Sequence, residues 1–134
     1  MRAIVPFAVG AGIMYFGTRT GGVSSLQSGL VTRIIQSMGI LRNLDFRMAM
    51  FIVRKMAHMF EYCLFAGSMN WTLRKSLNRK AAYASFLTAF FLASCDELVQ
   101  FSKEGRVGCV EDILIDSLGA AIGICLYNLL SKHA

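Results

Sequence analysis

Residues 54–73 read RKMAHMFEYCLFAGSMNWTL, and this stretch decides the fold class. Its second half is apolar, as in a membrane helix, whereas its first half carries Arg54, Lys55, His58 and Glu61. A charged side chain inside a bilayer costs about 2.5–3.5 kcal/mol on insertion scales, so a chain that keeps several of them usually uses them. We therefore interpret the stretch as a membrane helix that begins with a candidate functional site.

The composition of the 134-residue chain favours a membrane protein. Its content is 55% hydrophobic, with a single proline and a mean hydropathy of +0.52, which is too apolar for an ordinary soluble domain of this size. The net charge of +6 comes from scattered cations without a zinc-finger spacing or an RNP-like signature, so we expect no nucleic-acid partner. Without an internal repeat or a linker, residues 1–134 are expected to form one domain.

Charge-free runs elsewhere predict further membrane helices. The runs are shorter than the ~20 residues that cross a hydrocarbon core, so most of them must extend into the flanking ionisable residues. We expect an all-α integral membrane protein with four transmembrane helices, at about residues 3–19, 48–73, 80–101 and 109–131. The first has the short apolar run of a secretory signal peptide, but its charged region is minimal, and we expect it to be retained as an anchor.

Between the first and second of these helices, the sequence predicts an amphipathic interfacial helix from Ser24 to about Arg42. Its apolar stripe comprises Leu26, Leu30, Ile34, Met38 and Leu41, widened by Val31 and Ile35. Ser24 followed three residues later by Gln27 suggests a capping box at the start of the helix. The stripe either contacts lipid at the interface or packs on the transmembrane bundle, and the sequence leaves both open.

The loop between the second and third predicted membrane helices indicates how the chain is oriented. Residues 74–80 read RKSLNRK and contain four cations and no acid. The positive-inside rule places this loop in the cytoplasm, together with both termini, in a multi-pass protein of the bacterial cytoplasmic membrane. The candidate site then faces outward.

Helical spacing brings the polar residues of each predicted helix onto one stripe. Arg54, His58 and Glu61 follow one another at steps of four and three residues, which places them on one helix face. Two more sets share this spacing: Asp96, Glu97 and Gln100, and Asp112, Asp116, Gly119 and Gly123. Gly119 and Gly123 also form a GxxxG motif, which permits close helix approach. We expect the three stripes to converge.

In this order, four motifs resemble the VanZ-like family: Arg54-Lys55-x-x-His58-x-x-Glu61-Tyr62, Asp96-Glu97-x-x-Gln100, Gly105-Arg106 and Asp112-x-x-x-Asp116-x-x-Gly119. Asp116 stands where Asn is also common in that family. The resemblance implies a small bacterial multi-pass membrane protein, and the namesake is associated with low-level resistance to teicoplanin, a glycopeptide directed at lipid-linked cell-wall precursors. It implies no known reaction, so a role in handling envelope lipids or glycans is the broader expectation.

The residue types suggest a pocket for an anionic headgroup. Arginine binds phosphate or carboxylate in bidentate fashion, and lysine binds it as a point charge. Expected partners are membrane lipids, a lipid-linked cell-wall precursor or another envelope glycolipid. Predicted substrate-binding residues are Arg54, Lys55, Tyr62, Gln100 and Arg106. Predicted catalytic residues are His58, Glu61, Asp96, Glu97, Asp112 and Asp116. Among these, His58 suits proton transfer, with Glu61 or Glu97 orienting its ring.

Other interpretations of the same residues remain open. The protein is either a binding protein or a membrane enzyme that hydrolyses or transfers a phosphoryl or acyl group, although no GxSxG, phosphatase or cofactor motif is present. A divalent-metal site is a further alternative, built from His58, Glu61, Glu97, Asp112 and Asp116. No HExxH or cysteine-rich spacing supports it, so we assign no metal ligand and no cofactor. Finally, the charges could form a buried ion-pair network that only fixes helix packing.

Overall fold

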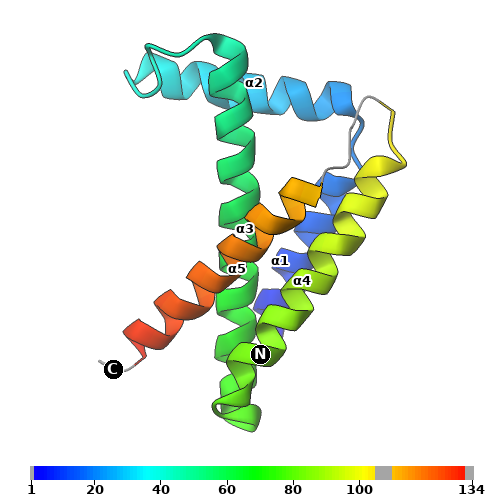
Figure 1. The fold of residues 1–134 in the computed structure, drawn as a ribbon, viewed down its shortest axis with the longest axis vertical. Coiled ribbons are helices and arrows are strands. Elements are labelled where there is room, and N and C mark those ends of the chain that lie inside the picture. Colours follow the sequence, from blue (N-terminus) through cyan, green and yellow to red (C-terminus); the bar gives the residue numbers. More distant parts are fainter. Residues whose placement is uncertain (1, 105–109, 132–134) are drawn as a thin grey trace.

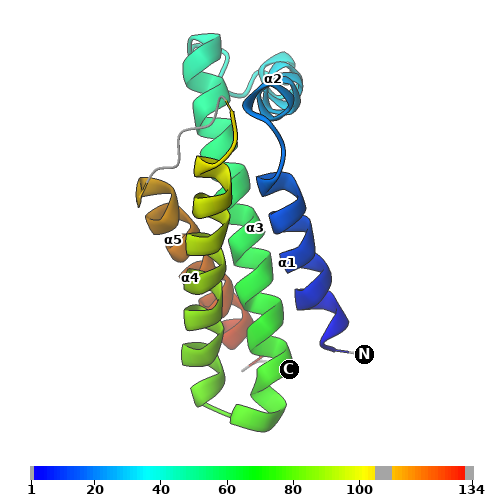
Figure 2. The same ribbon diagram turned by 90° about the vertical axis from the view of Figure 1, so that its right-hand side faces the viewer.

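The computed structural model of the protein describes residues 2–104 and 110–131, and all its regular structure is helical. The helices in this part of the chain are α1 (Ile4–Gly17), α2 (Gly21–Ser37), α3 (Phe46–Leu77), α4 (Lys80–Phe101) and α5 (Val110–Leu130). α3 runs along the long axis, α1 and α4 are tilted from it, α5 crosses α3 obliquely, and α2 lies across one end (Figures 1 and 2). The predicted all-α fold class is confirmed.

Two of the helices are long and apolar enough to cross a membrane, namely α4 and α5. α1 is apolar but has only 14 residues, and the hydrophobic sequence of α3 is interrupted by its ionisable side chains. Of the four predicted membrane helices, α4 and α5 therefore have the length and composition of a membrane-spanning helix. All four helices nevertheless begin and end within a few residues of the predicted bounds.

α3 is the longest helix and carries the first polar stripe. It begins after Asp45, whose carboxylate accepts a hydrogen bond of 3.0 Å from the backbone N–H of Arg47. Its 32 residues span roughly 48 Å at 1.5 Å per residue, which exceeds a hydrocarbon core of about 30 Å. It ends before Asn78, where φ is 49° and ψ is −123°, a positive-φ conformation that residues other than glycine rarely adopt. The predicted loop 74–80 is therefore mostly helical, with a turn only at Asn78 and Arg79.

Close backbone packing joins α3 to α5. A Cβ atom added to Gly119 would overlap the backbone carbonyl of Met59, and one added to Gly123 would overlap that of Cys63. Gly67 on α3 faces Gly123 in turn, since a Cβ there would lie 3.1 Å from the carbonyl oxygen of Gly123. The predicted close approach at the GxxxG motif is thus confirmed, and it brings the acidic half of α5 against α3.

Small side chains also fill the interior between α1, α3, α4 and α5. The buried hydrophobic cluster comprises Ile13, Tyr62, Phe65, Ala66, Ala89, Ala93, Ala120 and Ile124. Half of these residues are alanines, so the helix backbones approach one another closely.

α2 differs from the prediction in its bounds and in its N-terminal cap, and its apolar stripe, which the sequence leaves unassigned, is exposed. Its N-cap is Thr20, and the backbone N–H of Ser24 donates to the Thr20 carbonyl at 3.0 Å, so the predicted capping box at Ser24 is wrong. The helix ends at Ser37 rather than near Arg42, because Gly39 and Leu41 turn the chain with φ of 85° and 59°. The stripe is exposed at Leu26, Leu30, Ile34 and Met38, so it does not pack on the other helices.

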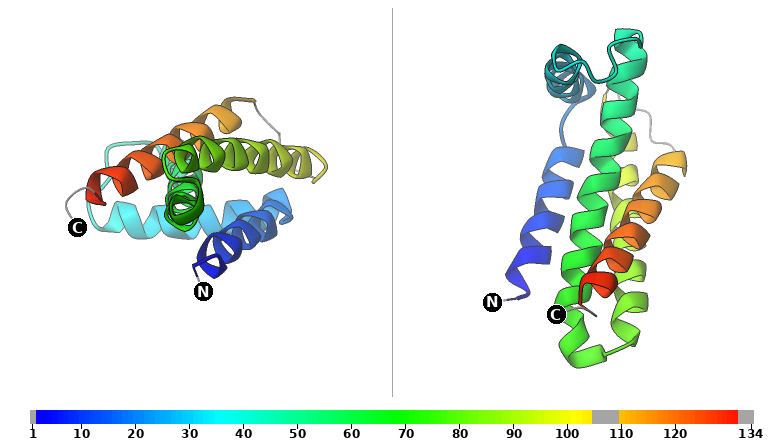
Figure 3. Two further views of the ribbon diagram at one scale, coloured as in Figure 1. Left: turned by 90° about the horizontal axis from the view of Figure 1, so that it is seen from below. Right: turned by 90° about the vertical axis from the view of Figure 1, so that its left-hand side faces the viewer.

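Three parts of the chain meet at the end of the bundle opposite α2. There α1 begins, α5 ends and α3 is joined to α4 (Figure 3). The hydroxyl of Thr72 donates to the backbone carbonyl of Arg2 at 3.0 Å, and the Arg2 guanidinium lies 5.1 Å from the centre of the Trp71 ring. The start of the chain and residues 74–80 therefore share one end of the molecule, as the prediction that both are cytoplasmic requires.

Candidate functional site

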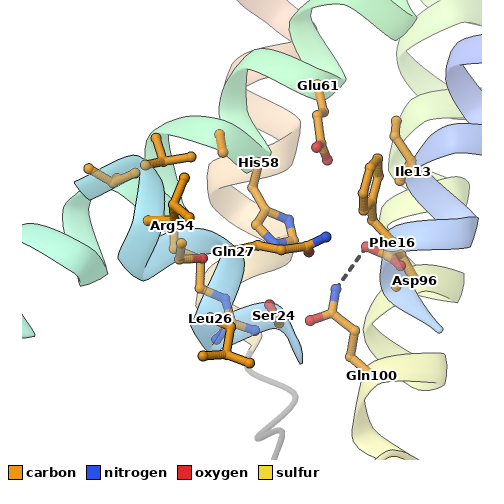
Figure 4. A pocket seen from close by; sticks show the side chains of 16 residues that line it. Ile13, Phe16, Ser24, Leu26, Gln27, Arg54, His58, Glu61, Asp96 and Gln100 are labelled. Carbon is orange, nitrogen blue, oxygen red and sulfur yellow. Dashed lines mark hydrogen bonds between the residues drawn. The ribbon is translucent and has the colours of Figure 1, made fainter. Parts of the chain in front are cut away.

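A cavity of about 530 Å³ lies at the α2 end of the bundle. Its walls come from the last turn of α1, the first half of α2, the first half of α3 and the last turns of α4 (Figure 4). The polar side chains in its lining gather from three helices that are well separated in the sequence. They are Ser24, Gln27 and Ser28 from α2, Arg54, His58 and Glu61 from α3, and Asp96 and Gln100 from α4.

Five of the predicted site residues line this cavity. Arg54, His58 and Glu61 do so as one stripe of α3, as their spacing predicts, and Asp96 and Gln100 face them from α4 (Figure 4). The side-chain amide of Gln100 donates to Asp96 Oδ2 at 2.8 Å, and both residues are almost fully buried. The predicted convergence of the first two stripes is therefore confirmed in geometry.

Asp116 lies beside His58 but does not line the cavity. His58 Nδ1 lies 3.6 Å from Asp116 Oδ1, and the Asp116 side chain is completely buried. Neither oxygen of Asp116 has a hydrogen-bond partner within the part of the chain that the structure describes. The carboxylate closest to the ring thus comes from α5, whereas Glu61 and Glu97 were the residues predicted to orient it.

The other predicted site residues lie elsewhere. The Lys55 ammonium forms an ion pair with Asp112 on α5, and neither residue lines the cavity. Tyr62 belongs to the buried hydrophobic cluster, and Glu97 is buried outside the cavity lining. The predicted substrate-binding residue Arg106 lies outside the described residues. The two acids of the third stripe therefore meet α3 at separate residues, Asp112 at Lys55 and Asp116 at His58.

The acidic side chains are not arranged as a metal centre in residues 2–104 and 110–131. No three His, Cys, Asp or Glu side chains there are gathered so that they could hold one ion. The divalent-metal alternative therefore has no geometric support among these residues.

The charge of the cavity lining is mixed, and its one cation among the described residues is Arg54. Glu61 and Asp96 are the acids. Arg54 forms no ion pair with a carboxylate in the described ranges, where the two pairs present are Lys55 with Asp112 and His58 with Asp116. The cavity thus holds a guanidinium whose hydrogen-bonding edge is available to a ligand.

The prediction missed the contributions of α1 and α2. Gln27 projects from α2 into the cavity (Figure 4), and Ser24 and Ser28 share its helix face. Gly17 also belongs to the lining, at the end of α1. A signal for the α2 residues was present, because steps of three and four residues within a serine-rich segment place polar groups on one face. No sequence pattern marks Gly17.

Comparison with known proteins gives one match. The model of a family described as VanZ/LLP1 matches residues 4–131. The comparison with curated proteins and the comparison with solved structures each found no match. The matched range includes all the helices described above and every residue in the cavity lining.

Proposed function

We propose, because the chain belongs to the VanZ/LLP1 family, that it is a multi-pass protein of the bacterial cytoplasmic membrane that binds the anionic headgroup of an envelope lipid in this cavity. The observation that carries the proposal is the guanidinium of Arg54 in the cavity lining, which forms no ion pair within residues 2–104 and 110–131. A planar fork of N–H donors suits the oxygens of a phosphate or a carboxylate. The low-dielectric surroundings strengthen such a contact.

The arrangement in the membrane is part of the proposal. α1, α3, α4 and α5 cross the bilayer, and α2 lies in the interface with its apolar stripe toward lipid. The exposed positions of Leu26, Leu30, Ile34 and Met38 support this position for α2, because the described part of the chain leaves the stripe uncovered. With both termini and residues 74–80 in the cytoplasm, the cavity lies at the outer surface, where envelope precursors are used.

Neutral donors beside Arg54 complete the headgroup site. The amides of Gln27 and Gln100 and the hydroxyl of Ser24 come from α2 and α4 and line the same cavity. They suit the glycerol or sugar hydroxyls that accompany a phosphate in lipid headgroups. Binding the headgroup of a lipid-linked cell-wall precursor would connect this site to glycopeptides such as teicoplanin, which are directed at such precursors.

A second candidate function is catalysis on the same lipid. Its specific support is the pair of His58 and Asp116, in which the carboxylate faces Nδ1 and the ring lines the cavity. A histidine held in this way can move a proton at Nε2, as in other pairs of a base and an orienting carboxylate. In such a hydrolysis Nε2 would take a proton from water, the water oxygen would form the new bond to the phosphorus or acyl carbon, and the ester bond of the lipid would break as the leaving alcohol receives that proton.

The headgroup proposal is tested by comparing two arginines of α3. We expect Arg54→Gln to weaken binding of phosphatidic acid, in nanodiscs of phosphatidylcholine, by about tenfold, which is ~1.4 kcal/mol. The matched control is Arg47→Gln, since Arg47 is exposed near the same end of α3 but lies outside the cavity lining. It should leave the affinity unchanged. Equal losses in both variants would show nonspecific attraction to a basic surface and would refute the proposal.

A further inference from the structure

The cavity has a polar floor and an apolar mouth. Arg54, His58, Asp96 and Gln100 lie on α3 and α4, whereas the walls toward α1 and α2 include large apolar side chains. Of these, Phe16 is 46% exposed, Leu26 is 76% exposed and Leu30 is 64% exposed. These three apolar residues of the lining therefore also form part of the outer surface of the protein.

The opening between α1 and α2 follows from how these helices pack. α2 packs on α3, and α1 packs on α3 and α4, but α1 and α2 do not pack extensively on each other. α2 lies across the end of the bundle above α1 (Figure 2). Phe16 of α1 and Leu26 and Leu30 of α2 are exposed and also line the cavity, so we place its side entrance between these two helices. If α2 lies in the interface, this entrance faces the bilayer rather than water.

The mixed lining selects among ligands. A small soluble anion would satisfy Arg54 but would leave the apolar wall in contact with water. A hydrocarbon alone would cover the wall but would leave the guanidinium without an acceptor. A molecule with an anionic headgroup joined to a hydrocarbon chain satisfies both parts of the lining.

The volume of the cavity fixes how much of such a molecule is enclosed. About 530 Å³ is the size of a pocket for one drug-sized molecule, and a whole phospholipid does not fit. The headgroup and the first part of a chain fill it, so the remainder of the chain must leave through the apolar mouth and stay in the bilayer.

We infer that the cavity takes an anionic amphiphile directly from the membrane, with its headgroup at Arg54 and its chain lying between α1 and α2 along Phe16, Leu26 and Leu30. This inference rests on the proposed headgroup binding and adds the class of ligand and its route. The ligand enters sideways and does not leave the bilayer.

The first test maps where the chain lies. The full-length protein in phosphatidylcholine nanodiscs is irradiated with phosphatidic acid that carries a diazirine on its acyl chain, and crosslinked residues are identified by mass spectrometry. We expect crosslinks at Phe16, Leu26 and Leu30, which excess dioleoyl phosphatidic acid removes. Crosslinks distributed evenly over the exposed faces of α4 and α5 would overturn the inference.

The second test separates the chain site from the headgroup site. Leu26 and Met38 lie on the same apolar stripe and are 76% and 70% exposed, but of these two only Leu26 lines the cavity. We expect Leu26→Gln to weaken phosphatidic acid binding about tenfold, whereas Met38→Gln leaves it unchanged. Equal losses in both variants would mean that the stripe only anchors α2, and the inference would fail.

A competition with inorganic phosphate distinguishes the two proposals. Both proposals stand if two results are obtained together. Inorganic phosphate displaces the lipid from the wild-type protein and not from Arg54→Gln, and it does so only at concentrations far above those of dioleoyl phosphatidic acid. If inorganic phosphate displaces the lipid at the same concentrations as dioleoyl phosphatidic acid, and its binding requires Arg54, the proposed anion binding is supported and the lipid route is refuted. If neither phosphate nor lipid binding depends on Arg54, the proposed function itself falls.

Discussion

Gly17, the last residue of α1, lies directly against the carboxylate of Asp96 on α4. A Cβ atom added to Gly17 would overlap Asp96 Oδ1 and would lie 3.1 Å from its Cγ. The carboxylate has little room to move, because Asp96 is 1% exposed and accepts the hydrogen bond of Gln100. The contact therefore fixes the end of α1 against the acidic part of α4, and with it one wall of the cavity.

We predict that Gly17→Ala displaces either α1 or Asp96. The expected loss of stability is about 1–3 kcal/mol, as for overpacking at a tight contact, together with weaker lipid binding. Thermal unfolding in one detergent and lipid titration in nanodiscs measure the two effects. The control is Gly12→Ala in the same helix, where a Cβ meets nothing within 4 Å and alanine favours the helix. If both variants unfold at the same temperature, the contact with Asp96 is not constraining.

The ion pair of Lys55 and Asp112 is predicted to hold α3 against α5 rather than to take part in the chemistry. Each side chain is less than one-fifth exposed, at 19% and 16%. Removing either partner should cost about 1–3 kcal/mol, because the other charge is then left poorly solvated, and the double variant should cost less than the sum. Unfolding of Lys55→Ala, Asp112→Ala and the double variant completes this cycle.

A charge exchange provides the control for that cycle. The variant with Lys55→Asp and Asp112→Lys should regain part of the lost stability and should keep lipid binding. Recovery of stability without any binding would show instead that Asp112 contributes to the site, as the sequence predicts.

Asp116 is predicted to act on His58 through a hydrogen-bond acceptor, so the amide should replace it better than a methyl group does. Asp116→Asn keeps an oxygen on the side of Nδ1, which lies 3.6 Å from Asp116 Oδ1 in the native protein. It should retain lipid binding within a few-fold, whereas Asp116→Ala should weaken binding about tenfold. Nitrogen NMR of labelled histidine should show Nδ1 protonated in the native and Asn proteins and a mixture of tautomers in the Ala protein.

His133 is the other histidine of the chain, and His133→Gln gives a spectrum with His58 alone. An unchanged tautomer in Asp116→Ala would show that Asp116 does not orient the ring.

The parts of the site that the sequence predicts are those governed by helical periodicity. Steps of three and four residues place Arg54, His58 and Glu61 on one face of α3, and in the structure all three line the cavity. Lys55 is predicted to bind substrate because of its charge and not because of its helix face. Consecutive residues point about 100° apart on a helix, so Lys55 faces α5 while Arg54 faces the cavity.

The other features of the fold and the site depend on contacts between helices, and such contacts produce no periodic pattern in the sequence. In the sequence, Gly17 is an ordinary glycine of an apolar helix, and its role becomes visible only from its contact with Asp96 of α4. The start of α2 was predicted too late, because Gly21 and Gly22 are poor helix formers and Ser24 is a good N-cap. The exposed stripe of α2 also could not be assigned, since an amphipathic pattern has the same spacing whether its apolar face meets lipid or protein.

The last prediction concerns the orientation of the protein in the membrane. Four cations lie close together at the end where α3 joins α4, at Arg74, Lys75, Arg79 and Lys80. Cations at the opposite end are more dispersed, and two of them lie over aromatic rings, Arg19 over Tyr15 and Arg33 over Phe46. The positive-inside rule counts cations in short loops, so the turn between α3 and α4 should be cytoplasmic and the cavity outward.

Cysteine labelling in intact cells measures this orientation. In a background where Cys63, Cys95, Cys109 and Cys125 are replaced by alanine, Ser76→Cys and Ser102→Cys place one thiol at each end of the bundle, both at exposed positions. A membrane-impermeant maleimide should label the variant at Ser102 directly and the variant at Ser76 only after permeabilisation, which also shows that both thiols are reactive. Labelling of the Ser76 variant alone in intact cells would show the opposite orientation, with the cavity at the cytoplasmic surface and its ligand in the inner leaflet.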